Sequence, residues 1–171
     1  MPHDARSIAN FFLDQAEANG VALSHLKIQK LLFFAHAWNL AKFDQPLIGQ
    51  PFEAWKYGPV VRVVYDQLKS YKSKSVVTRL TRIDPTTGEF TESYSNYNSE
   101  TRELLSSIYY FYGQFHALKL SDLTHQKGGP WDRTWGKAKI SAVNGMIIPD
   151  NLIKSWFEEK VNHPDWGGMV V

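Results

Sequence analysis

Residues that could carry catalysis or bind a metal are few and scattered along the sequence. None of the six histidines forms an HExxH pair or another close pair of metal ligands; they are His3, His25, His36, His116, His125 and His163. Glu53, in the aromatic run PFEAWKYGP, is the acid with the most unusual surroundings. General acid catalysis by Glu53 would require burial that raises its pKa, whereas a structural Glu53 would accept hydrogen bonds from backbone amides or a nearby lysine. The structural role is favoured, and a hydrolase that uses Glu53, His125 or both is the alternative.

The glycine-containing stretch 128–136, GGPWDRTWG, does not have the composition of a phosphate-binding loop. No Lys-Ser/Thr pair follows the glycines, and Pro130 removes an N–H group that a phosphate cradle would use. The sequence also lacks a G-x-S-x-G elbow and a G-x-G-x-x-G loop, and it contains no cysteine that could bind a metal. We therefore expect a protein that is not an enzyme and has no metal or cofactor, although a zinc site assembled from distant residues stays open. The 128–136 stretch is predicted to form a tight turn between two helices.

Aromatic residues make up 14% of the chain, and several lie where a partner protein could contact them. Trp55 and Tyr57 occur in an irregular stretch before a predicted helix, while Arg62, Tyr65 and Lys69 follow at spacings of three and four and share a helix face. Trp, Tyr and Arg are the residue types that dominate protein–protein hot spots. These five residues are predicted to bind a partner, with core packing of Trp55 as the alternative.

Basic residues are concentrated in one segment, although the net charge is only +2. Residues 54–82 contain seven basic side chains and one acidic one, whereas residues 84–103 contain five acidic side chains and one basic one. Three interpretations stay open: cross-strand pairing within a hairpin, a basic face for an acidic partner protein and, least favoured, nucleic-acid binding.

Periodicity and capping residues predict a mainly α (α+β) fold, a compact helical domain of about six to seven helices with a small β-hairpin. Asp4 and Ser24 are good N-caps for a first helix that stops at Gly20 and a second over 25–42. The second helix is apolar on so many sides that we expect it at the centre of a bundle. Further helices are expected from Pro59 to about Tyr71, from Asn98 or Ser99 to about Ala117, after a cap at Ser121, from Pro130, and after a cap at Asp150.

Alternating residues predict the hairpin. Residues 76–83 and 89–94 both alternate, and the Asp-Pro-Thr-Thr-Gly sequence at 84–88 has the composition of a turn. Between the second and third helices, residues 43–58 are rich in Pro and Gly and are expected to form a loop with short extended pieces. Ile147 and Ile148 are expected to form another short extended piece.

Length and composition predict one domain. The chain has 171 residues, of which 43% are hydrophobic and 21% charged, which suits a single globular domain. We expect that domain to span residues 1–163, followed by a flexible C-terminal tail at 164–171. No apolar run approaches the length of a membrane span and the first residues do not resemble a signal peptide. The absence of cysteine suits a reducing compartment, so a cytoplasmic protein without membrane contact is expected.

Three blocks of the sequence resemble one known family. Residues 27–41, KIQKLLFFAHAWNLA, are similar to a KLQKLLY-like helix, and residues 51–69, PFEAWKYGPVVRVVYDQLK, contain an E-x-W-x-x-GPV element followed by a tyrosine. LTHQKGGPW at 123–131 matches a later LTH…W segment. These blocks mark the SocA/Panacea antitoxin-domain family, which includes phage-associated GepA-like proteins, and the resemblance extends from about residue 5 to residue 160. The departures, Ile28 and Phe33 in place of Leu and Tyr, are conservative.

The resemblance implies an antitoxin of a bacterial or phage toxin–antitoxin system, which neutralises a cognate toxin protein by direct binding. It also implies a proteolytic adaptor that delivers the toxin to ClpX of the ClpXP protease. The family pattern gives Lys30, Glu53, Gly58 and Pro59 as a structural signature. The predicted partner-binding set is Trp55, Tyr57, Arg62, Tyr65, Lys69, His125 and Trp131.

Two alternatives stay open within this interpretation. The signature aromatics either contact the toxin or pack the helices together, in which case the toxin would bind outer faces such as the 76–94 hairpin. A DNA-binding autoregulator of its operon would need a helix–turn–helix, for which only the region 98–127 offers space, and its first helix is too aromatic. The sequence leaves both a monomer and a homodimer open.

Overall fold

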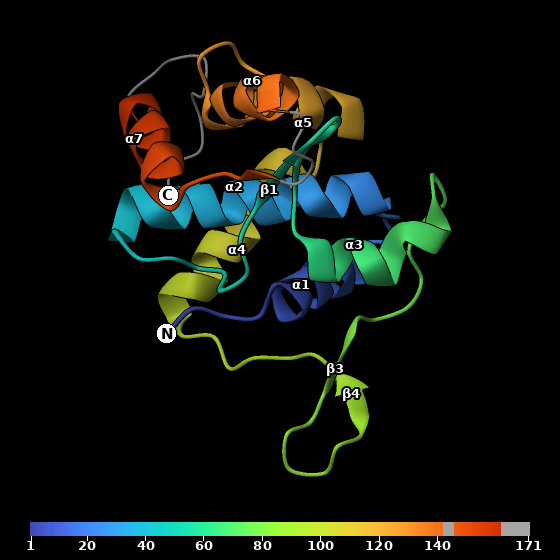
Figure 1. Cartoon of the computed structure of the whole chain (residues 1–171). Helices are drawn as coiled ribbons and strands as arrows, with labels where there is room; N and C mark the ends of the chain where they lie inside the picture. The colour runs from blue at the N-terminus through green and yellow to red at the C-terminus, as the bar shows by residue number, and fades with distance from the viewer. Residues whose placement is uncertain (142–145, 162–171) are drawn as a thin grey trace.

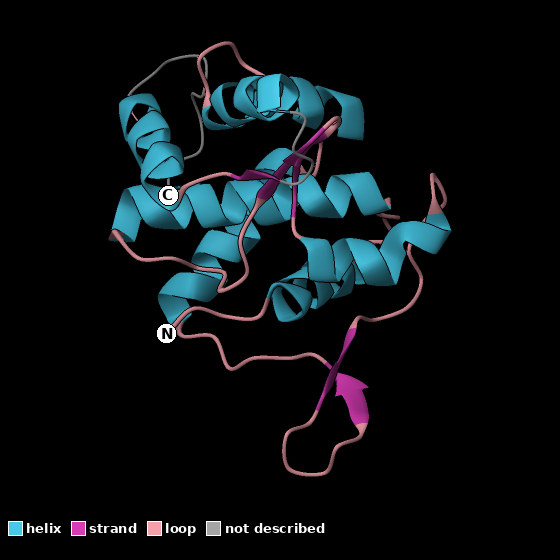
Figure 2. Ribbon diagram, viewed as in Figure 1, coloured by secondary structure: helices cyan, strands magenta, loops and turns pink. Residues whose placement is uncertain are grey.

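The computed structural model describes residues 1–141 and 146–161. Within these ranges seven helices are arranged with α2 (His25–Phe43) at the centre, a small three-stranded sheet lies against α2, and a two-stranded ribbon projects from the body (Figures 1 and 2). The helices are α1 (Ala5–Ala18), α2 (His25–Phe43), α3 (Arg62–Leu68), α4 (Ser99–Tyr112), α5 (Ala117–Thr124), α6 (Pro130–Ser141) and α7 (Asp150–Lys160). A short 3-10 helix, Lys69–Tyr71, extends α3. The predicted α+β class with six to seven helices is confirmed.

Helix α2 is the centre of the molecule. Every residue from Ile28 to Leu40 is buried, because α1, α4, α5, α7 and the sheet all pack against it (Figure 1). The Ser24 side chain accepts a hydrogen bond from the Lys27 amide and starts the helix, as predicted. A helix buried on all sides has no room for unpaired polar groups, so the polar residues within it must find partners inside the protein.

The sheet is built from strands that are too short to show in the sequence. Strand β1 (Glu53–Trp55) pairs antiparallel with β2 (Gly58–Val60) on one side and with β5 (Met146–Ile147) on the other. The prediction that Pro59 opens a helix is wrong, because Pro59 lies opposite Ala54 in β2 and α3 begins only at Arg62. An edge strand accepts proline, since its missing N–H group is not needed by a neighbour.

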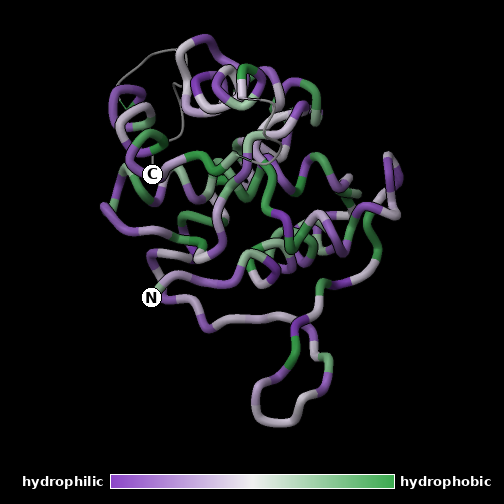
Figure 3. Tube along the Cα trace, in the orientation of Figure 1, coloured by the Kyte–Doolittle hydropathy of each residue, from purple (hydrophilic) through white to green (hydrophobic). Residues whose placement is uncertain are grey.

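The predicted hairpin is present but shorter than expected. Strand β3 (Thr81–Ile83) pairs with β4 (Phe90–Glu92), and the ribbon extends away from the helices (Figure 1). Figure 3 shows hydrophobic stretches in this ribbon as well as in the body; among them, Ile83 and Phe90 lie opposite each other and are exposed. Arg79, at the base of the ribbon, pairs with Asp14 and Glu17 of α1 and not with the acidic side chains of residues 84–103.

The long helix predicted over 98–117 is interrupted. Helix α4 ends at Tyr112, and Ser121 lies inside α5 and does not cap it. Lys27 donates a hydrogen bond from Nζ to the Gly113 carbonyl at 2.5 Å, which ties the break between the two helices to α2. The predicted tail at 164–171 lies outside the described residues. No helix in the described ranges is long and apolar enough to cross a membrane.

Asn10 of α1 fixes the base of the ribbon and provides a test of the fold. Its buried side chain donates to the carbonyls of Leu80 (2.8 Å) and Ser93 (2.9 Å) and accepts from the Leu80 amide (2.8 Å). Asn10→Ala leaves these buried backbone groups without partners, so we expect the free energy of unfolding to fall by about 2–4 kcal/mol in urea denaturation. Asn19→Ala, which removes an exposed amide bonded to Gln15, should cost less than about 1 kcal/mol. Equal losses would contradict this role of Asn10.

Candidate functional site

The β1–β2 hairpin carries most of the predicted site residues and is anchored to α2 by two neighbouring polar side chains. Gln29 donates from Nε2 to the Val61 carbonyl (3.2 Å) and accepts at Oε1 from the Val61 amide (2.9 Å). Lys30 donates from Nζ to the Pro59 carbonyl (3.2 Å). Both side chains are buried. The end of β2 is therefore fixed against the central helix by hydrogen bonds that are shielded from water.

Gly58 makes the close approach of the hairpin to Lys30 possible. Its φ angle is +106°, and a Cβ atom there would lie 2.5 Å from Lys30 Nζ and 2.8 Å from the Thr124 hydroxyl. An L side chain rarely adopts this conformation, and any side chain would displace the ammonium group. Glycine at this position therefore allows β2 to cover Lys30.

The interior around Lys30 disfavours positive charge. Burial lowers the pKa of Lys30 to about 7. Burial also lowers the pKa of His25 and of His125, and the charge of Lys30 lowers both further. The Nε2 atoms of both histidines are buried and have no hydrogen-bond partner. The charge state of Lys30 therefore influences both histidines beneath the hairpin.

Glu53 organises the outer side of the hairpin. Its buried carboxylate accepts from Arg62 Nε (3.0 Å) and Nη2 (2.7 Å) and from Trp55 Nε1 (2.8 Å). The Arg62 guanidinium lies over the Trp55 ring (5.4 Å), and Tyr65 packs on the same indole (4.5 Å). Glu53 thus has hydrogen-bond partners other than those expected from the sequence, and it presents an aromatic ring and a cation side by side at the surface.

A second aromatic group supports the hairpin from α6. Trp131 is buried, donates from Nε1 to the Trp55 carbonyl (2.8 Å) and stacks on His125 (3.8 Å) and Trp135 (5.8 Å). Ser121 of α5 donates to the Tyr57 carbonyl (3.4 Å). These contacts connect the third family block to the second, although the two are far apart in the sequence.

The predicted partner-binding residues differ in how much surface they offer. Tyr57, Arg62 and Lys69 are exposed, Trp55, Tyr65 and His125 are half-buried, and Trp131 is buried. The structure brings Trp55, Arg62 and Tyr65 into contact, whereas Lys69 begins the 3-10 helix after α3 and pairs with Asp66. Signature residues Lys30, Glu53, Gly58 and Pro59 are all buried. A side chain with little surface can act on a partner only by holding its exposed neighbours.

Sequence reasoning missed Gln29 and Thr124. The signal for Gln29 was its place beside Lys30 in the middle of the most apolar helix, where two adjacent polar residues need internal partners. Thr124 lies in the LTH…W block of the sequence, but only the fold brings it to Gly58.

The geometry offers little for a hydrolase or a metal centre. The Glu53 carboxylate is occupied by Arg62 and Trp55, and no contact between Glu53 and His125 is found. Within residues 1–141 and 146–161, no three or more His, Asp or Glu side chains are grouped to hold a metal ion.

A pH dependence of stability follows from Lys30. Its pKa is about 7 when folded and about 10.4 when unfolded, so between these values the unfolded chain binds more protons and stability rises with pH. The maximum slope for one proton is about 1.4 kcal/mol per pH unit. We expect Lys30→Met to be at least as stable as the wild type at pH 6 and to lack this rise in urea denaturation between pH 7 and 9. The exposed control Lys137→Met should keep the rise, and a Lys30→Met protein that also keeps it would contradict the assignment.

Gly58→Ala tests the close approach of the hairpin. Backbone strain and displacement of Lys30 should together cost about 2–4 kcal/mol of unfolding free energy. Gly88 is the matched control, because its φ is +73° and nothing lies within 4 Å of a Cβ atom there; Gly88→Ala should cost about 1–2 kcal/mol. Similar losses, measured by thermal or urea unfolding, would show that contact with Lys30 is unimportant.

The part of the chain that contains most of α2 and the β1–β2 hairpin matches a known protein family. Residues 28–132 match the family described as Antitoxin SocA-like, Panacea domain, a range that contains Lys30, the hairpin and Trp131. Antitoxin SocA of Caulobacter vibrioides (strain NA1000 / CB15N) is 34% identical over 154 residues, covering 90% of this chain and 82% of that protein. No solved structure matches the chain. The buried hydrogen bond of Lys30 and the hairpin around Glu53 are thus features of a chain that belongs to the SocA-like, Panacea-domain family of antitoxins.

Proposed function

We propose that this protein neutralises a cognate toxin by direct binding, and that the contact is centred on the outer side of the β1–β2 hairpin. The observation that carries the proposal is the group formed by Trp55, Arg62 and Tyr65, with Tyr57 exposed at the turn beside it. The similarity to Antitoxin SocA supports the class of partner.

The physical basis is a rigid aromatic anchor. Glu53 fixes both Arg62 and Trp55, and Trp131 holds the Trp55 backbone. Side chains already fixed before binding lose little conformational entropy when a partner covers them. Such anchors at the centre of an interface of about 1,600 Å² are sufficient for a specific complex.

The partner can be identified by copurification. The product of the adjacent open reading frame, co-expressed with tagged antitoxin, should copurify with it and should arrest growth when expressed alone. An adjacent gene product that is neither toxic nor bound would overturn the proposal.

Tyr57→Ala tests the position of the contact. Tyr57 is 62% exposed, so its removal should leave the unfolding midpoint unchanged, but a hot-spot loss of about 2 kcal/mol should weaken toxin binding about 30-fold in calorimetry. Tyr110→Ala in α4 is the matched control, because Tyr110 is 61% exposed and lies outside the hairpin. Equal affinities of both variants for the toxin would place the contact elsewhere.

A role as a proteolytic adaptor rests on the family resemblance, in which the antitoxin delivers the toxin to ClpXP. We expect the toxin's half-life to lengthen in cells without ClpX if delivery contributes to neutralisation. An unchanged half-life, with growth still protected, would leave occlusion by binding as the mechanism.

A further inference from the structure

The charge of this protein is divided between two parts of the chain. Residues 54–74 and 117–141 together contain ten basic and three acidic side chains, whereas the rest of the chain contains nine basic and fourteen acidic ones. The ten are Lys56, Arg62, Lys69, Lys72, Lys74, Lys119, Lys127, Arg133, Lys137 and Lys139. The small net charge of +2 therefore conceals a strong asymmetry.

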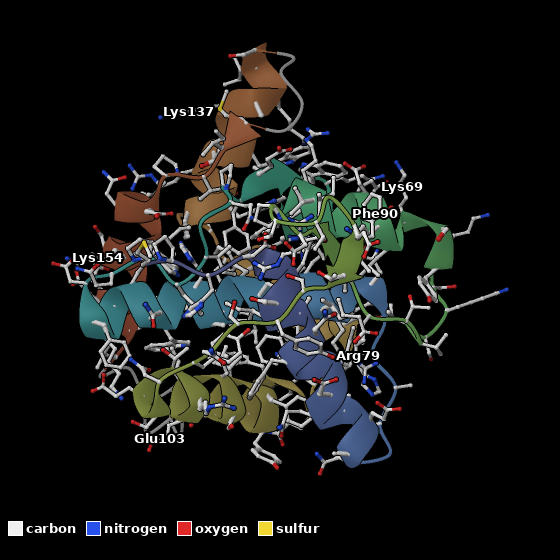
Figure 4. The ribbon with its side chains drawn as sticks, turned by 90° about the horizontal axis from the view of Figure 1, so that it is seen from below. Lys69, Arg79, Phe90, Glu103, Lys137 and Lys154 are labelled. Carbon is white, nitrogen blue, oxygen red and sulfur yellow. The ribbon has the colours of Figure 1, made fainter. Side chains whose placement is uncertain are left out.

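The two basic segments meet in space at the hairpin. The first comprises the β1–β2 turn, α3, the 3-10 helix and the turn that follows it, and the second comprises α5, α6 and the turn between them. Helix α6 packs on β1 and α5 packs on β2. In Figure 4, Lys69 and Lys137 lie on one side of α2, and the acidic Glu103 lies on the opposite side. We call the surface formed by these two segments the basic face.

The cations of the basic face are largely unneutralised. All ten are exposed, and among the described residues only Arg62 and Lys69 form ion pairs with a carboxylate. Elsewhere, Arg79 and Lys154 form ion pairs with acidic side chains of other segments, and Arg6 pairs with Asp4 at the start of its own helix. The unpaired charges therefore produce a field that reaches about 10 Å into solvent at moderate salt.

The two basic segments also carry exposed apolar side chains. Tyr57, Leu118 of α5 and Ile140 of α6 are 62%, 72% and 90% exposed. Apolar anchors surrounded by a charged rim are typical of a protein–protein interface. A dedicated nucleic-acid surface would instead be dominated by cations and hydrogen-bond donors.

We propose that the basic face is the docking surface for an acidic surface of the toxin protein, whose carboxylates it steers into contact with the hairpin. This inference rests on the proposed function and specifies the chemistry of its partner. Complementary charge mainly accelerates association, and its effect falls with ionic strength. The surface of the toxin that is covered would accordingly be rich in Asp and Glu.

Charge reversal at two lysines tests the proposal and leaves the aromatic and apolar side chains of the basic face unchanged. Lys119→Glu/Lys137→Glu alters α5 and α6, and neither lysine forms an ion pair among the described residues. The association rate with the copurified toxin, measured by surface plasmon resonance at 50 mM salt, should fall about 10-fold or more. The difference from the wild type should largely disappear at 500 mM salt.

The matched control carries the same charge change outside the basic face. Lys42→Glu/Arg82→Glu alters two exposed residues of α2 and β3, and we expect less than about a threefold change in the association rate. Equal effects of the two double variants would show that net charge alone matters and would overturn the inference, although toxin binding itself would stand. If the wild type binds no toxin, both the proposed function and the inference fail.

Nucleic acid is the competing occupant and has its own measurement. Mobility shifts with a 30-base-pair operator duplex and with a folded RNA should show no binding at 150 mM salt. A tight complex that Lys119→Glu/Lys137→Glu abolishes, together with an unaltered rate of toxin association, would assign the basic face to nucleic acid and overturn the proposal.

Discussion

The buried ammonium group of Lys30 and the strand that covers it constrain the rest of this structure. A fully buried charge is expensive, and here the Lys30 side chain donates a hydrogen bond to the Pro59 carbonyl. That bond requires β2 to lie directly on α2, which in turn requires Gly58. Because β2 pairs with β1, the position of Glu53 follows from the same contact, and with it the placement of Trp55 and Arg62.

An interior polar anchor of this kind specifies geometry more than it adds stability. Hydrophobic residues at Gln29 and Lys30 would fit the central helix without a desolvation cost, yet they would not fix the register of a three-residue strand. The bonds of Gln29 to both backbone groups of Val61 define that register to a single residue. A hairpin held in this way presents Tyr57 and Trp55 in one orientation, which is what a preorganised binding surface needs.

Local patterns predicted the central helix well and the three-stranded sheet poorly, for a physical reason. The cap at Ser24 and the apolar residues of α2 are local signals, and both are confirmed. Strand β5 pairs with Glu53 across more than 90 residues of sequence, and three-residue strands carry no visible alternation. Pro59 after Gly58 has the appearance of a helix start, but tertiary pairing of β1 with β2 prevails over that preference.

The candidate site shows the same division between local and tertiary information. The spacing of Arg62 and Tyr65 correctly indicated a shared face, and the structure adds that Trp55 completes it. The burial of Trp131 could not be inferred, because its partner is a backbone carbonyl of another block.

The distribution of charge combines both kinds of information. The basic segments are visible in the sequence, but only the packing of α6 on β1 brings them together in space. Rigid anchors govern mainly how slowly a complex separates, and the surrounding charges govern how fast it forms. In the proposed complex, the hairpin fixed on α2 would supply the first property, and the unpaired cations of the basic face would supply the second.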